Sequence, residues 1–357
     1  MSPWVVLRLI IGLVVLTELN TALFYPIFPE LVKTYGVDAQ TMQIPSYAVL
    51  LTFGLGLFCW APLVAQWGRR PVALSGVFLF IVGSILTAIA PVYTAFLAGR
   101  LIQSFALSCG GVLSPVVPTD LFKGTDLRRA FAQISMVFSI TPVVAQVLGG
   151  YVSSHYHHGL VFLGFAVAGA ALWVLFYCYF PETKKNDVAA ASVPAGYLSW
   201  FKGNVGILKD PVFVRNVLCL WLIFAGESLY VTVSHFALQL DFGVSAQNSG
   251  WFGALASGGL LLGAFTSFRL SNYLDLATTI RWGLSLCVLG STFLVVGQLI
   301  DIPGPALWIA PMFIYLVGAG LVYPNAINAI MKHFVHQSTQ AAALLSTTSS
   351  ANGTIPA

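Results

Sequence analysis

Long apolar runs separated by short polar segments dominate this sequence. Ten of them are about twenty residues or longer, the length that an α-helix needs to cross a bilayer core. They lie near residues 5–29, 43–65, 71–91, 94–120, 129–153, 159–181, 212–238, 248–268, 279–300 and 305–331. An eleventh run, shorter and rich in Ser and Thr, extends from about Ser338 to Ala357. The pattern predicts an all-α polytopic membrane protein with about ten complete spans and a partial eleventh.

The composition supports a membrane protein and argues against a soluble domain, a nucleic-acid-binding protein and a metal or disulfide site. Of the 357 residues, 58% are hydrophobic and only 8% are charged, whereas a soluble domain carries about 25% charged residues. The net charge of +4 does not indicate nucleic acid, because the basic residues flank the apolar runs. The cysteines lie singly in apolar segments, and the histidines of "SHYHHG" (Ser154 to Gly159) have no spacing diagnostic of a metal site. We expect no disulfide, metal or cofactor.

The distribution of Lys and Arg orients the spans. Of sixteen basic residues, fourteen fall on the side of the N-terminus, Lys33 falls on the other side, and Arg100 falls within a span. Positive residues gather in cytoplasmic loops. We therefore predict a cytoplasmic N-terminus.

Two halves of the chain repeat one another. "YGVDAQ" at 35–40 matches "FGVSAQ" at 242–247, and "GGVLSP" at 110–115 matches "AGLVYP" at 319–324, at offsets of 207 and 209 residues. The same offset of 209 relates Glu18 to Glu227, the two carboxylates deep in spans. The repeat predicts two pseudo-symmetric six-helix halves with a site between them near the midplane. We expect an N-terminal half at 1–183, a cytoplasmic loop at 184–211 and an incomplete C-terminal half at 212–357, since the chain ends before a twelfth run.

A series of motifs carries a family resemblance. In order they are "FYPIFPELVKTYGV", "GLGLFCWAPLVAQWGRRPVAL", "GRLIQSFALSCGGVLSPVVPTDLF", "TPVVAQVLGGYV" and "FPETKK". They resemble the major facilitator superfamily, specifically the proton-coupled drug exporters of the bicyclomycin-resistance group. The resemblance extends over essentially the whole chain and is most specific in residues 23–183. It implies a secondary active transporter, not an enzyme, that exports amphipathic small molecules by alternating access.

The turn between the second and third spans departs from the family pattern G-x-x-x-D-R-x-G-R-R-P. Gly68, Arg69 and Arg70 match it, but the acid is replaced by Ala65. In the family this turn is a cytoplasmic gate whose acid holds the two halves together. We predict that Arg69 or Arg70 still pairs with Asp120 at the end of the fourth span, within its own half, and that the latch between halves is weak.

Three charged residues within spans are the candidates for proton coupling. Glu18 lies about 18 Å along its helix at 1.5 Å per residue, near the midplane. A carboxylate there is costly unless it is neutral, hydrated or paired, so it suits a group that exchanges a proton. Glu227 is its counterpart in the second half. Arg100 matches the family's arginine in the fourth span, and we expect it to pair with Glu18 or with substrate; structural ties between helices are the alternative for all three.

Polar and aromatic residues in the spans are candidates for substrate binding, although helix packing is the alternative for each. The polar candidates are Asn20, Gln103, Gln146, Tyr230 and Asn325. The aromatic candidates are Phe24, Tyr25, Phe224 and Tyr323.

The resemblance also implies a location and partners. We expect a monomer in a bacterial inner membrane, with protons and a small molecule as its ligands and no nucleic acid. Two other functions stay open: export or import of one metabolite, such as a siderophore, and a non-transporting sensor, binding protein or truncated inactive remnant.

Overall fold

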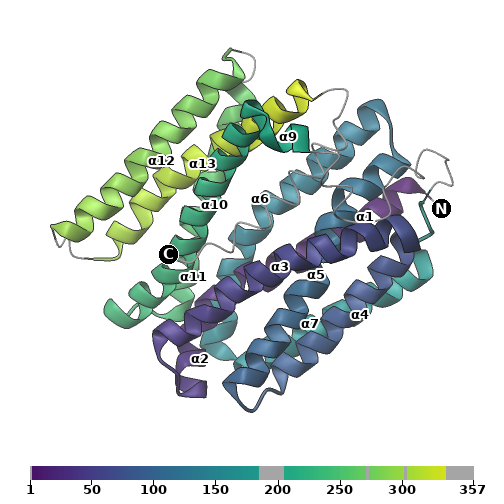
Figure 1. The fold of residues 1–357 in the computed structure, drawn as a ribbon. Coiled ribbons are helices and arrows are strands. Elements are labelled where there is room, and N and C mark those ends of the chain that lie inside the picture. Colours follow the sequence, from purple (N-terminus) through teal and green to yellow (C-terminus); the bar gives the residue numbers. More distant parts are fainter. Residues whose placement is uncertain (1, 185–204, 271–272, 301–303, 335–357) are drawn as a thin grey trace.

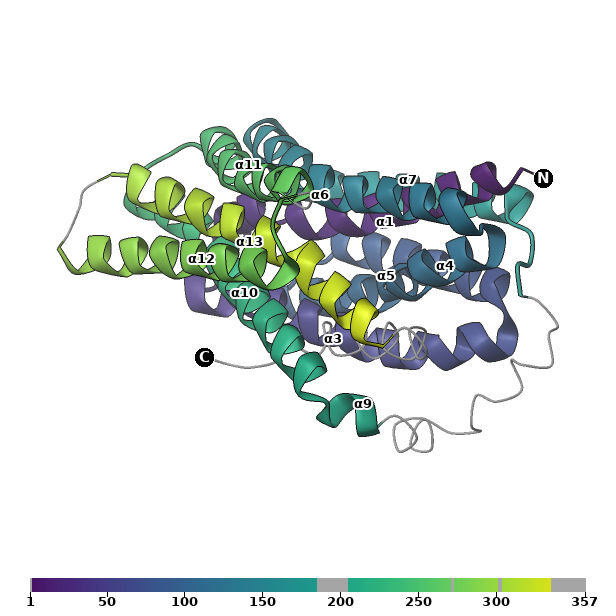
Figure 2. The ribbon, with the colours of Figure 1, turned by 90° about the horizontal axis from the view of Figure 1, so that it is seen from above.

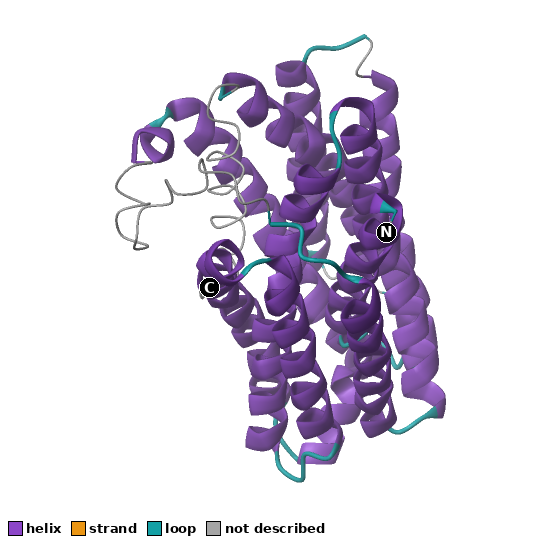
Figure 3. Ribbon diagram, turned by 90° about the vertical axis from the view of Figure 1, so that its right-hand side faces the viewer, coloured by secondary structure: helices purple, strands orange, loops and turns teal. Residues whose placement is uncertain are grey.

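The computed structural model describes residues 2–184, 205–270, 273–300 and 304–334, and every regular element in these ranges is a helix (Figure 3). Within these ranges, ten helical segments are long and apolar enough to cross a membrane. The helices are α1 (Pro3–Ala22), η1 (Tyr25–Ile27), α2 (Phe28–Tyr35), α3 (Ala39–Trp67), α4 (Arg69–Ala88), α5 (Tyr93–Leu121), α6 (Gly124–His155), α7 (His158–Tyr179), α9 (Val205–Lys209), α10 (Pro211–Phe236), η3 (Ala237–Asp241), α11 (Ala246–Leu270), α12 (Leu276–Leu299) and α13 (Ala306–His333). The predicted all-α polytopic fold is confirmed. The eleventh run and most of the central loop lie outside the described residues.

The helices form two groups that lie side by side. Helices α1 to α7 make one group and α10 to α13 the other, as the colours of Figures 1 and 2 show. One buried apolar cluster lies mainly within the first group and a second lies within the other. We call the membrane face at which α1 begins the N-terminal face, and the other the opposite face.

The sequence repeat corresponds to a repeated turn. Gly36 and Gly243 have φ values of 62° and 63°, a left-handed conformation that is open to glycine and strained for most other residues. Two residues later, side-chain oxygens cap the next helix: Asp38 accepts from the N–H of Thr41 at 3.1 Å, and Ser245 accepts from that of Asn248 at 3.2 Å. The helices that follow, α3 and α11, start 207 positions apart.

The first span is broken, although its apolar pattern is continuous. After Ala22 the chain passes through the short 3-10 helix η1 before it continues as α2. Pro26 and Pro29 lie in this region, and a proline within a helix removes a backbone donor and clashes with the preceding turn. The break turns α2 toward the second group, where the ring of Phe28 lies 5.4 Å from that of Phe236.

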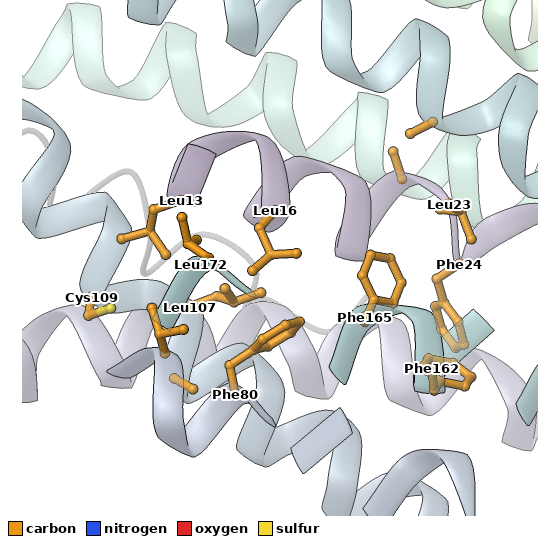
Figure 4. Packing of buried hydrophobic residues seen from close by; sticks show 14 of the residues in the cluster. Leu13, Leu16, Leu23, Phe24, Phe80, Leu107, Cys109, Phe162, Phe165 and Leu172 are labelled. Carbon is orange, nitrogen blue, oxygen red and sulfur yellow. The ribbon is translucent and has the colours of Figure 1, made fainter. Parts of the chain in front are cut away.

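Large apolar side chains fill the first group and also cover the outside of the molecule. Figure 4 shows Leu13 and Leu16 of α1 packed with Phe80 of α4 and Leu107 of α5. On the second group, apolar side chains such as Phe268, which is 74% exposed, point outward. An apolar outer surface matches the lipid that surrounds a membrane protein.

Candidate functional site

A cavity of about 590 Å³ lies between the two groups of helices. Residues of α1, α3, α5 and α6 line it on one side, and residues of α10 and α13 line it on the other. The lining includes the aromatic residues Phe53, Phe131, Phe138, Trp221, Phe224 and Tyr323. Glu18 is the one acidic or basic residue among the described residues that line the cavity. The cavity is therefore apolar and aromatic, with one carboxyl group in its wall.

The cavity occupies the part of the molecule between its middle and the N-terminal face. On α6, which begins at that face, the lining residues Phe131 and Phe138 lie in the first half of the helix. On α13, which ends there, Tyr323 and Ile327 lie in the second half. Both helices therefore contribute the segment nearer to the N-terminal face.

The two groups touch closely at the opposite face. Helices α6 and α11 meet there at Gly150 and Gly250. The Cα atom of Gly250 lies 3.1 Å from the position that a Cβ on Gly150 would take. Gln239 donates to the carbonyl of Pro26 at 3.1 Å, and the ring of Tyr25 lies 6.5 Å from that of His235. The conformation is thus closed at the opposite face, with the cavity on the side of the N-terminus.

Glu18 and Glu227 approach the cavity from the two groups. Glu18 lines it directly. Glu227 lies one turn after the lining residue Phe224 and is a hydrogen-bond partner of the lining residue Tyr323. The two carboxyl groups are near enough to influence one another electrostatically. The structure therefore brings together two acids that are 209 positions apart in the sequence.

Arg100 has neutral partners, so the expected pair with Glu18 is absent from this structure. Its guanidinium donates to Asn20 Oδ1 and Gln103 Oε1, both at 2.9 Å, and lies 4.2 Å from the ring centre of Phe24. Among the described residues, no carboxylate lies within 4.0 Å of it. The reason is helical geometry: Glu18 and Asn20 are about 200° apart around α1, and Arg100 contacts the side that carries Asn20.

The candidates for substrate binding divide into two sets. Asn20, Phe224 and Tyr323 line the cavity. The others are buried among neighbouring helices: Phe24, Tyr25, Gln103, Gln146, Tyr230 and Asn325. Gln146, for example, donates to Ser257 across the interface of α6 with α11 at 2.6 Å. In the present conformation this second set is packed between helices, and its role in substrate binding stays a prediction.

Sequence reasoning missed several lining residues. Trp221 lines the cavity, and its indole N–H is buried without a hydrogen-bond partner. On α5 the small residues Ser104, Gly111 and Ser114 line the cavity together with Leu107 and Pro115. Their spacing places them on one helical face, and this stripe of small residues was the available signal.

The turn at Gly68 is held within its own half. Arg69 Nε lies 2.9 Å from Asp120 Oδ2, so the predicted contact is present. The carboxylate of Glu182, just after α7, accepts from the backbone N–H groups of Arg69 at 2.9 Å and Arg70 at 3.1 Å. A Cβ at position 68 would overlap this carboxylate. Glu182 thus binds the positive N-terminus of α4, a role that sequence reasoning missed; the gating role of the turn stays a prediction.

Replacing Glu182 by Gln should weaken this connection. Partial burial raises the pKa of Glu182, but backbone hydrogen bonds from Arg69, Lys184 and Arg70 outweigh it and hold the pKa below its usual value. A carboxylate with a depressed pKa stabilises the fold above its unfolded-state pKa and loses that effect as the pH falls. We expect a loss of about 1 kcal/mol near neutral pH, measured by thermal unfolding, and a smaller loss at acid pH. Asp126→Asn, at an exposed ion pair with Arg129, is the control and should change little.

Comparisons with known proteins agree with this architecture. Residues 10–356 match the family model described as Major Facilitator Superfamily. The uncharacterized MFS-type transporter YdgK of Bacillus subtilis is 27% identical over 340 residues, which cover 93% of this chain and 82% of that protein. Multidrug resistance protein D of Escherichia coli is 24% identical over 347 residues, with 95% and 84% covered. The xylose transporter XylE of E. coli, in a partially occluded inward-open conformation, is similar with a TM-score of 0.74 at 12% identity, with 98% of this chain and 89% of that chain covered.

Proposed function

The chain belongs to the major facilitator superfamily, and on that premise we propose that it is a proton-coupled exporter of amphipathic cations. The observation that carries the proposal is the cavity, whose wall contains Glu18 together with several aromatic side chains. Aromatic faces and a carboxylate both attract an organic cation, and an apolar wall accommodates the rest of such a molecule. Similarity to a protein named for multidrug resistance supports the same substrate class.

Competition for one negative charge supplies the coupling. A cation and a proton both neutralise Glu18 or Glu227, so that protonation from one side weakens the hold on a cation. The halves then rock about their contact to expose the cavity to the other side. If the N-terminus is cytoplasmic, as the distribution of Lys and Arg indicates, the present conformation faces the cytoplasm and corresponds to loading of an exporter.

The cavity argues against an anionic metabolite. Among the described residues that line it, none is basic, and the buried Arg100 lies behind Asn20. A carrier for a polyanionic siderophore needs positive groups at its site. We therefore favour a cation, and leave transport of an anion as an outcome of the test.

The test is transport by the purified full chain in proteoliposomes. Vesicles with an acidic lumen are diluted into alkaline buffer with a labelled lipophilic cation, such as tetraphenylphosphonium. An antiporter accumulates the cation as protons leave, and nigericin, which collapses the pH gradient, abolishes the accumulation. Equal accumulation with and without the pH gradient, or transport of an anion alone, would contradict the proposal.

Arg100→Lys should impair this transport. A lysine carries the same charge but cannot donate to Asn20 and Gln103 in the planar geometry of a guanidinium. Because Asn20 lines the cavity, we expect gradient-driven uptake to fall about tenfold, on the scale of about 1.4 kcal/mol. Uptake by Arg129→Lys, at an exposed position on α6, should match that of the original chain. Equal uptake by both variants would show that the guanidinium contacts of Arg100 with Asn20 and Gln103 do not support transport.

A further inference from the structure

Three side chains of the types that ligate metal ions meet at the opposite face, away from the cavity. Glu30 lies in the first turn of α2, His157 precedes α7, and His158 is its first residue. One ligand atom from each lies within 4.8 Å of the other two. Glu30 is more than 120 positions from the histidines in the sequence, so the histidine spacing alone could not indicate this cluster.

Two of the three ligands are already held in place. Nδ1 of His158, whose side chain is 5% exposed, lies 3.2 Å from Oε1 of Glu30. The backbone N–H of His158 donates to the same oxygen at 3.2 Å, and the hydroxyl of Ser153 donates to Oε2 at 3.4 Å. Such hydrogen bonds fix the orientation of a ligating carboxylate. The third ligand, His157, is exposed, and its Nδ1 accepts from the backbone N–H of Gly159 at 3.2 Å, so its Nε2 is the nitrogen that would bind an ion.

The spacing suits a small divalent ion with tetrahedral geometry. Zinc binds imidazole nitrogen and carboxylate oxygen at about 2.0–2.2 Å, which places neighbouring ligand atoms roughly 3.4 Å apart. The 3.2 Å between His158 and Glu30 is close to that separation. Movement of His157 toward this pair completes three protein ligands, and water takes the fourth position. Magnesium and calcium prefer sets made of oxygen alone.

We propose that Glu30, His157 and His158 form a zinc site at the opposite face. Zinc competes with protons for its ligands, so its affinity rises with pH. The bound ion connects α2, the last part of the broken first span, to the start of α7. It therefore stabilises the position of α2 within the first group of helices.

The experiment uses the purified full chain with its affinity tag removed, because a polyhistidine tag binds zinc. Zinc is titrated by calorimetry and by thermal unfolding at two pH values, with magnesium as a second ion. Cobalt(II) is added separately, since its visible spectrum reports tetrahedral coordination. We expect saturable binding of one zinc ion, a higher unfolding temperature, tighter binding at the higher pH and no effect of magnesium.

His157→Gln is the decisive variant, and His155→Gln is its matched control. His157 is exposed and its loss leaves the contact between His158 and Glu30 intact, so the fold should persist. His155 is an exposed histidine near the same turn, and its ring Nδ1 donates to the backbone carbonyl of Tyr151 at 2.8 Å. We expect His157→Gln and Glu30→Gln to weaken zinc binding at least tenfold, and His155→Gln to leave it unchanged. Equal affinity in all variants, or no saturable binding, overturns the proposal.

Discussion

Replacing Glu18 by Gln should weaken binding of a lipophilic cation about tenfold and remove the pH dependence of that binding. Glutamine has nearly the shape of a protonated glutamate but cannot ionise, so the cavity loses the charge for which proton and cation compete. A tenfold loss corresponds to about 1.4 kcal/mol, within the range expected for one charge facing a bound cation. The measurement is equilibrium binding of a fluorescent cationic dye between pH 6 and pH 9.

The same substitution should abolish gradient-driven accumulation while exchange of cation for cation continues. Exchange needs only that the cavity opens alternately to the two sides of the membrane. Accumulation also needs the protein to release and rebind a proton. Glu18→Asp keeps the carboxyl group and should retain part of the coupling. Asp126→Asn, on the exposed surface of α6, serves as the control for the loss of a carboxylate. Full accumulation by Glu18→Gln would exclude Glu18 as a coupling residue.

Glu227→Gln should give the same phenotype in a weaker form. Glu227 contacts Tyr323 and does not itself line the cavity, so a bound cation is nearer to Glu18. If the two acids share one proton, the double variant should lose no more than Glu18→Gln loses alone. Additive losses would instead indicate two independent proton sites.

Gly250→Ala should have the largest effect on conformation. A methyl group there would overlap the backbone carbonyl oxygen of Gln146, in the contact of α6 with α11. Backbone cannot rotate aside as a side chain can, so the helices must separate at the opposite face. Overpacking of this kind costs about 1–3 kcal/mol. That cost falls on the conformation described here and should shift the population toward one that is open at the opposite face.

Spin labels at the ends of α6 and α11 on that face report the change as a longer distance between them. Gly258→Ala is the matched control, because it lies on the same helix and a Cβ there meets nothing within 4 Å. We expect the control to keep the distances of the original chain. An unchanged distance in both variants, with unchanged unfolding temperatures, would show that this glycine contact does not hold the face closed.

Some contacts at the candidate sites could be predicted from the sequence, and others could not. Arg69 or Arg70 was predicted from the family motif to pair with Asp120 within the first half, and the contact of Arg69 with Asp120 is present. The contact of Glu182 with the start of α4 was not predicted, because nothing in "FPETKK" indicates that its carboxylate accepts hydrogen bonds from that helix. Arg100 was expected to pair with Glu18 or with substrate, and in the structure it contacts amide oxygens and an aromatic ring instead of Glu18. Which charge faces which depends on helix rotation, and the sequence does not specify that rotation.

The sequence by itself determined the membrane class, the number of long apolar spans and the repeated turn that starts α3 and α11. These features follow from local physics: the length of apolar runs, the conformational freedom of glycine at positions 36 and 243, and the side-chain caps that follow. Only the tertiary structure decided which candidate residues face the cavity. It also showed that α6 and α11 contact one another through glycines, and that Glu30 lies next to His157 and His158. Such contacts join residues far apart in the chain, and they depend on how each helix is rotated and how closely it packs, which short-range sequence patterns do not encode.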